Sequence, residues 1–150
     1  MKRLIRNAIW IVAAGLTGCA SEPQTVNTSD MCAQIGHFAN SSDNDHRVRW
    51  VELSADRRCT GDSSTGASQM CQFLTTTSSV DVDRERALEC LHDTNVERYT
   101  SGDLTMVRYT ARLAEYTDRR VLVRVEYPVG AQSKSSLKIS AQRLPPLRQL

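Results

Sequence analysis

Two short segments contain serines in patterns that partly match the nucleophile motifs of hydrolases. Gly61-Asp62-Ser63-Ser64 sets a glycine close to two serines, and glycine permits the tight turn that exposes a nucleophilic hydroxyl. Ser135-Ser136-Leu137-Lys138 fits Ser-x-x-Lys, in which a lysine one helical turn later can activate the serine. The first segment lacks the full Gly-x-Ser-x-Gly elbow and consists of ordinary turn residues, and the second lies in an expected strand without companion motifs. Neither segment predicts a nucleophile.

The acidic residues and histidines of the sequence do not predict an acid–base or a metal site either. Asp81 and Asp83 are the notable pair of acids, but they precede an expected helix, where acids complement the helix dipole. His37, His46 and His92 show neither paired metal-ligand spacing nor a catalytic neighbourhood, and the chain has no glycine-rich phosphate loop. We therefore expect no enzyme, no metal and no cofactor. A hydrolase acting on the cell wall is the alternative.

A set of arginines is the best candidate for a binding site. They alternate with apolar residues, so a strand would place them on the side away from Val107 and Val121. The guanidinium fork recognises carboxylates and phosphates. The alternative is a solvated sheet face balanced by Glu115, Asp118 and Glu126. The candidate residues for binding an anion or a partner are Arg108, Arg112, Arg120 and Arg124.

The pattern of the N-terminal segment predicts an export signal. Basic residues over 1–6 precede an apolar run over 8–16, which is too short to span a membrane because a spanning helix needs roughly 20 apolar residues. The run closes with Leu16-Thr17-Gly18-Cys19, which resembles the bacterial lipobox. This resemblance covers the signal segment alone and implies cleavage before Cys19 and lipid on that cysteine. An ordinary secretory signal cut after Ala20 is the alternative.

The resemblance also implies a domain organisation and a location. Residues 1–18 would be the signal peptide, 19–29 the lipidated cysteine with a flexible tether, and 30–150 one small periplasmic domain. In enterobacterial lipoproteins an Asp after the cysteine causes retention in the inner membrane, whereas Ala20 and Ser21 follow here. The implied location is the outer membrane, facing the periplasm, with the membrane as a partner through Cys19.

Charge and location together restrict the other partners. Cleavage removes Lys2, Arg3 and Arg6, so the formal charge falls from +2 to −1. Residues 19–104 are acidic and residues 105–150 are basic, and we expect the two parts to attract each other. Nucleic acid is not an expected partner of an exported chain. For the arginine face we expect an acidic envelope protein, lipopolysaccharide phosphate or peptidoglycan carboxylate.

Four cysteines follow the lipobox, and an even number in an exported chain suits two disulfides. Zinc is the rival, but no two of these cysteines have Cys-x-x-Cys spacing. Three pairings are open. Because Cys59 and Cys71 flank the polar stretch over 60–68, we favour a bridge between them, which leaves Cys32 with Cys90.

Periodicity predicts the elements that would position these residues. Alternation over 107–113 and 121–127 predicts an antiparallel hairpin whose second strand ends at Pro128 and Gly130. Residues 95–103 are expected to be a connection. Further strands are predicted over 46–53 and 137–141, and helices over 31–40 (with Asp30 as N-cap), 69–75 and 83–92.

The predicted fold class is α+β. Helices pack on one face of an antiparallel sheet, a three-stranded meander comes last, and two disulfides stabilise the domain. From this organisation we expect a lipid-anchored envelope protein that binds rather than catalyses. Its role would be that of an accessory or assembly factor, or of an inhibitor or immunity-type protein.

Overall fold

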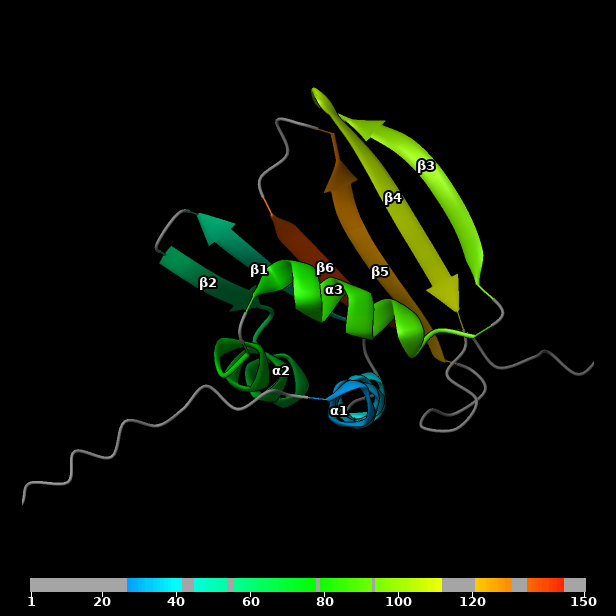
Figure 1. The fold of residues 1–150 in the computed structure, drawn as a ribbon. Helices are drawn as coiled ribbons and strands as arrows, with labels where there is room; N and C mark the ends of the chain where they lie inside the picture. The colour runs from blue at the N-terminus through cyan, green and yellow to red at the C-terminus, as the bar shows by residue number, and fades with distance from the viewer. Residues whose placement is uncertain are drawn as a thin grey trace, which may run out of the picture.

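The computed structural model describes residues 27–41, 45–53, 56–77, 79–92, 94–111, 121–130 and 135–144. These residues form three helices and a six-stranded sheet (Figure 1). The proposed signal segment and Cys19, and two of the candidate arginines, Arg112 and Arg120, lie outside the described residues. The helices are α1 (Thr28–Asn40), α2 (Thr65–Thr75) and α3 (Val80–Glu89). The strands are β1 (His46–Leu53), β2 (Asp56–Gly61), β3 (Asn95–Ser101), β4 (Leu104–Ala111), β5 (Val121–Val129) and β6 (Ser136–Arg143).

The sheet is antiparallel, with the strand order β2-β1-β6-β5-β4-β3. Strands β4, β5 and β6 form the predicted C-terminal meander, and β3 extends it at one edge (Figure 1). At the other side the β1–β2 hairpin joins the meander through β1, which pairs with β6. The first and last of the described strands, β1 and β6, are therefore neighbours inside the sheet.

The strands have one apolar and one polar face because their side chains alternate. On β1, His46, Val48 and Trp50 are buried, while Arg47 and Arg49 between them are exposed. We call the side with the buried residues the core face and the side with the intervening residues the polar face. The core-face residues share one buried cluster with residues of the helices. Its strand members are Val48, Trp50, Ala111, Val121, Val123, Val125, Leu137, Ile139 and Ala141.

Each helix begins at a polar N-cap whose side chain accepts a backbone N–H from the first turn. These caps are Asn27, Ser64 and Ser79. The predicted cap Asp30 is wrong, because Asn27 caps α1 and accepts the N–H of Asp30, which lies in the first turn. Helices α2 and α3 also begin earlier than predicted, directly after their serine caps.

Two strands were not expected from the sequence. Strand β3 occupies most of the predicted connection over 95–103, and β2 ends inside the predicted loop over 60–68. Both are edge strands in which only Cys59 and Tyr99 are half-buried and the other side chains are exposed, so they show no apolar alternation. Strand β5 also continues through Pro128 to Val129. Since Pro128 has no partner in the β5–β6 ladder, its missing N–H removes no hydrogen bond on that side.

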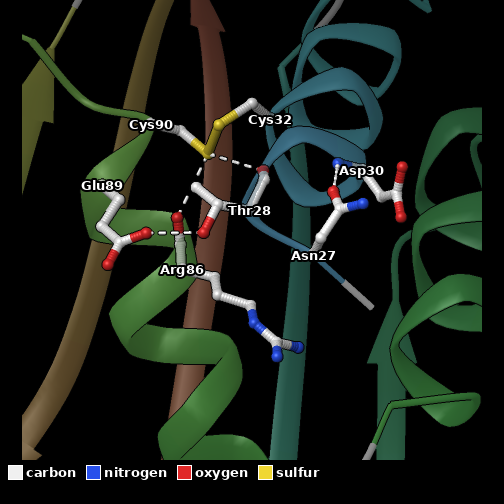
Figure 2. The surroundings of a disulfide bond; sticks show 7 residues. All are labelled: Asn27, Thr28, Asp30, Cys32, Arg86, Glu89 and Cys90. Carbon is white, nitrogen blue, oxygen red and sulfur yellow. Dashed lines mark hydrogen bonds between the residues drawn. A yellow bond between two sulfur atoms is a disulfide. The ribbon is translucent and has the colours of Figure 1, made fainter. Parts of the chain in front are cut away.

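Two disulfides connect the helices to the rest of the domain. Cys59 of β2 is bonded to Cys71 of α2, and Cys32 of α1 is bonded to Cys90, the C-cap residue of α3. These are the pairs that the sequence favoured. Figure 2 shows the second bridge, beside which the Thr28 hydroxyl donates to Glu89 Oε2 at 2.6 Å. The start of α1 is thus fixed to the end of α3 by a covalent bond and a hydrogen bond.

Candidate anion-binding site on the polar face of the sheet

Charged side chains form a continuous row across the polar face. Following the strand register from β1 to β3, the row is Arg49, Lys138, Glu126, Arg108 and Glu97. The last four of these alternate in sign, whereas Arg49 and Lys138 are a like-charge pair at the β1 end. A second row beside it holds Arg47 on β1, Ser140 on β6 and Arg124 on β5. The two rows together concentrate positive charge over β1, β6 and β5.

At the β3 end of the first row the charges are balanced around Glu126, which is only 2 % exposed. Its Oε1 accepts from Arg108 Nε and from the Tyr99 hydroxyl, each at 2.7 Å, and Lys138 Nζ lies 2.7 Å from its Oε2. Burial alone would raise the pKa of Glu126, but these hydrogen bonds lower it from 4.5 to about 2.

The candidate residue Arg108 is committed to this network. Besides its bond to Glu126, its Nη1 donates to Glu97 Oε2 at 3.0 Å, and its guanidinium lies 4.5 Å from the centre of the Tyr99 ring. Its charge is therefore neutralised by two carboxylates. Arg108 holds the polar face of β3, β4 and β5 together and is not available to an external anion.

At the β1 end the charge is not balanced. Within the part of the chain that the structure describes, the guanidinium groups of Arg47, Arg49 and Arg124 form no ion pair. Among the described acids, Lys138 pairs only with Glu126, which it shares with Arg108. These four residues, Arg47, Arg49, Arg124 and Lys138, are called the cationic cluster below.

Two acids near the cluster are occupied by other donors. Asp62 Oδ2 accepts the backbone N–H of Arg47 at 2.7 Å, and its Oδ1 accepts from the backbone and hydroxyl of Ser64. Burial would raise the pKa of Asp62, but these bonds lower it overall. Asp45 Oδ1 accepts the backbone N–H of Arg143 at 3.2 Å. Both carboxylates thus accept backbone N–H groups at the rim of the cluster, and neither forms an ion pair with its guanidinium groups.

The cluster surrounds two adjoining cavities in the polar face. One, of about 360 Å³, is lined by Arg47, Arg124, Lys138 and Ser140, with Asp45 and Gln142 among its other walls. The other, of about 470 Å³, lies between Arg49 and Thr60 and shares Arg47, Asp62 and Lys138 with the first. Such an arrangement can hold an anion, because guanidinium forks and a hydroxyl donate to the same small volume.

The serine segments noted in the sequence have structural roles. The Ser64 hydroxyl caps α2 and donates to Asp62. Ser135 precedes β6 and its hydroxyl donates to Asp81 Oδ2 at 3.3 Å, whereas Lys138 contacts Glu126 on the polar face. The Ser-x-x-Lys segment therefore does not bring its lysine to its serine.

Asp81 and Asp83 do not share a cleft either. Asp81 is on the surface, 3.0 Å from Arg84 Nη1. Asp83 is fully buried under α3, where its Oδ2 accepts from Trp50 Nε1 at 3.1 Å and from the Thr77 hydroxyl. Burial raises its pKa, although these two bonds oppose the shift. Among the residues placed by the structure, no three His, Cys, Asp or Glu side chains gather as metal ligands would.

Of the four arginines predicted from the sequence, Arg108 and Arg124 are described, and both lie on the polar face but in different environments. Sequence reasoning missed Arg47, Arg49 and Lys138 as site residues. The alternation of Arg47 and Arg49 with Val48 and Trp50 predicted a strand with an arginine-bearing face. The pairing of that strand with β6, which completes the cluster, has no signature in either segment.

No family model matches the chain, and neither a curated protein nor a solved structure shows significant similarity to it. None of the described helices is long and apolar enough to cross a membrane.

Proposed function

We propose that the chain is a lipid-anchored envelope protein that acts by binding a negatively charged partner on its polar face, without catalysis. The observation that carries the proposal is the cationic cluster, in which three guanidinium groups have no ion pair among the described residues. Exposed arginines near a cavity favour recognition of an anion, because a rigid fork of donors matches a carboxylate or a phosphate.

In the proposed arrangement all three helices cover the core face of the sheet, so the polar face is open to a partner. Each helix contributes side chains to the single buried cluster that contains the core-face residues of the strands. Representative members are Ile35 of α1, Met70 of α2 and Ala87 of α3. A partner can then approach the polar face without displacing a helix.

The proposed anchor positions this surface above a membrane. The lipobox-like segment ending at Cys19 implies lipidation, and residues 20–26, which precede the N-cap of α1, would reach at most about 25 Å if extended. The domain would therefore meet components of the envelope close to the bilayer, such as an acidic protein or glycan. Roles as an accessory or assembly factor, or as an inhibitor or immunity-type protein, fit this arrangement.

The anchor is tested by replacing Cys19 with Ser and separating membrane from soluble fractions. We expect the wild type in the membrane fraction, and the variant to be neither lipidated nor cleaved at this site. A variant that is still processed and still retained as efficiently as the wild type would contradict lipidation at Cys19.

The binding surface is tested by crosslinking in intact envelopes. The test variant carries Arg47→Gln and Arg124→Gln, and the matched control removes the same charge with Arg58→Gln and Arg98→Gln. Arg58 is an exposed arginine paired with Asp56, and Arg98 lies on the exposed edge strand β3. We expect the crosslinked partner to be lost in the test variant and kept in the control. Equal crosslinking by both variants would contradict the proposal.

A further inference from the structure

We propose that the cationic cluster binds a sugar phosphate, with the phosphate held above Ser140 between Arg47 and Arg124. This inference rests on the proposed function, since it names the ligand of the same surface. The residues come from three adjacent strands: Ser140 of β6 is directly opposite Arg47 of β1 on one side and Arg124 of β5 on the other.

The register brings four donors to one volume. Adjacent strands lie about 4.8 Å apart, so the two arginines start roughly 10 Å from each other with the Ser140 hydroxyl between them. Lys138 lies two residues along β6 from Ser140, on the same face and about 7 Å away along the strand. All four side chains line the cavity of about 360 Å³.

The number of donors favours a phosphate over a carboxylate. A phosphomonoester carries nearly two negative charges at neutral pH and offers three acceptor oxygens. It can therefore accept from two guanidinium forks and the hydroxyl at once, whereas one carboxylate offers two oxygens and a single charge. A dianion would also relieve the repulsion between Arg49 and Lys138, which lie directly opposite each other on β1 and β6.

The rest of the cavity indicates what the phosphate is attached to. Beside the cationic residues, the walls include the carboxylates of Asp45 and Asp62 and the amide of Gln142. Oxygens of these groups accept hydrogen bonds from hydroxyl groups. A ligand that carries hydroxyls next to its phosphate satisfies both parts of the cavity. In an envelope this chemistry occurs in soluble sugar phosphates and in the headgroups of phosphorylated glycolipids.

The test is calorimetric titration of the full chain, purified in a non-ionic detergent, with glucose 1-phosphate, glucuronate and glucose. We expect glucose 1-phosphate to bind at least tenfold more tightly than glucuronate, and glucose not to bind measurably. Arg124→Gln should weaken the binding of glucose 1-phosphate at least tenfold and Ser140→Ala severalfold. Arg58→Gln, which removes an exposed charge outside the cavity, should leave it unchanged. Circular dichroism verifies that each variant is folded.

Equal affinity for glucuronate, or full affinity in Arg124→Gln, would overturn the inference. If glucose 1-phosphate does not bind while crosslinking still requires Arg47 and Arg124, the ligand inference fails and the proposed binding function stands. If both fail, the cluster is a solvated surface. Micelles containing a phosphorylated glycolipid, before and after phosphatase treatment, distinguish the sources: displacement of glucose 1-phosphate by the untreated lipid alone identifies the headgroup as a ligand.

Discussion

Arg49 and Lys138 lie directly opposite each other on the neighbouring strands β1 and β6. Like charges at directly opposite positions destabilise a sheet. Glu126, the acid beside Lys138, is shared with Arg108 and does not reach Arg49. The part of the polar face over β1 and β6 thus carries more positive charge than the described acids neutralise.

Replacing Arg49 should therefore stabilise the protein. We expect Arg49→Gln to raise the free energy of unfolding by about 0.2–1 kcal/mol, because the repulsion of Lys138 is removed. Urea unfolding of both proteins at low ionic strength measures the difference, and the gain should shrink as salt screens the repulsion. Arg58→Gln is the control, since this exposed residue pairs with Asp56 and should not stabilise. A loss of stability in Arg49→Gln would show that the side chain has a structural role.

Glu126 should be the most sensitive charge of the sheet. It is buried and contacts Tyr99, Arg108 and Lys138, so Glu126→Gln leaves two cations without their shared counter-ion. Because both cations are partly exposed, we expect a loss of about 2–3 kcal/mol in the free energy of unfolding. Glu97→Gln, at a side chain that is 56 % exposed, should cost less than about 1 kcal/mol. Denaturant unfolding measures both losses. If Glu126→Gln and Glu97→Gln lost similar free energies of unfolding, Glu126 would not be the centre of the network.

Glu126 should also make stability depend on pH in the acid range. Its pKa is about 2 in the folded protein, below the ordinary value of 4.5, so the unfolded chain binds the proton more readily. The stabilisation is present above pH 4.5 and is lost as the pH falls from 4.5 toward 2, by roughly 2–3 kcal/mol. Asp83, with a pKa raised by burial, acts in the opposite direction but is common to wild type and variant. The free energies of unfolding of wild type and Glu126→Gln, measured as a function of pH, should therefore converge near pH 2. A difference between them that stays constant with pH would contradict this account.

The two disulfides should contribute unequally. Cys32–Cys90 spans 58 residues of sequence and Cys59–Cys71 spans 12. In the loop-entropy description, removing the first pair costs about 4 kcal/mol and removing the second about 3 kcal/mol. Denaturant unfolding of the two double Cys→Ser variants measures these losses. A larger loss from the shorter loop would indicate that native packing around Cys59 outweighs chain entropy.

Strands β1, β4, β5 and β6 could be predicted from the sequence, because burying one face of a strand makes apolar residues recur at every second position. Strand β1 has the predicted bounds, and β4, β5 and β6 follow the predicted meander, since along most of each strand every second side chain is buried. In the edge strands β2 and β3 nearly every side chain is exposed, so no alternation of apolar and polar residues marks them. Their pairing comes from backbone hydrogen bonds to a neighbour, which any sequence of suitable extended conformation can make.

The candidate site could be predicted only in part, for a related reason. Alternation places Arg108 and Arg124 on the polar face. Whether a carboxylate neutralises each arginine depends on residues of other strands. Glu97 neutralises Arg108 from β3, and Arg47 joins Arg124 across β6. These neighbours follow from strand order, which periodicity within one segment does not encode.

The Cys32–Cys90 bridge has a mechanical consequence. A pull on the N-terminal side of the domain, where the proposed tether enters, first loads the turn that begins at Asn27 and Thr28. Because Cys32 is covalently joined to Cys90 beyond the end of α3, the load passes through that bond and into the α3 side of the domain. The rest of α1 and its contacts in the core are shielded from the force, so a protein held to a moving surface at this end can keep its opposite face intact.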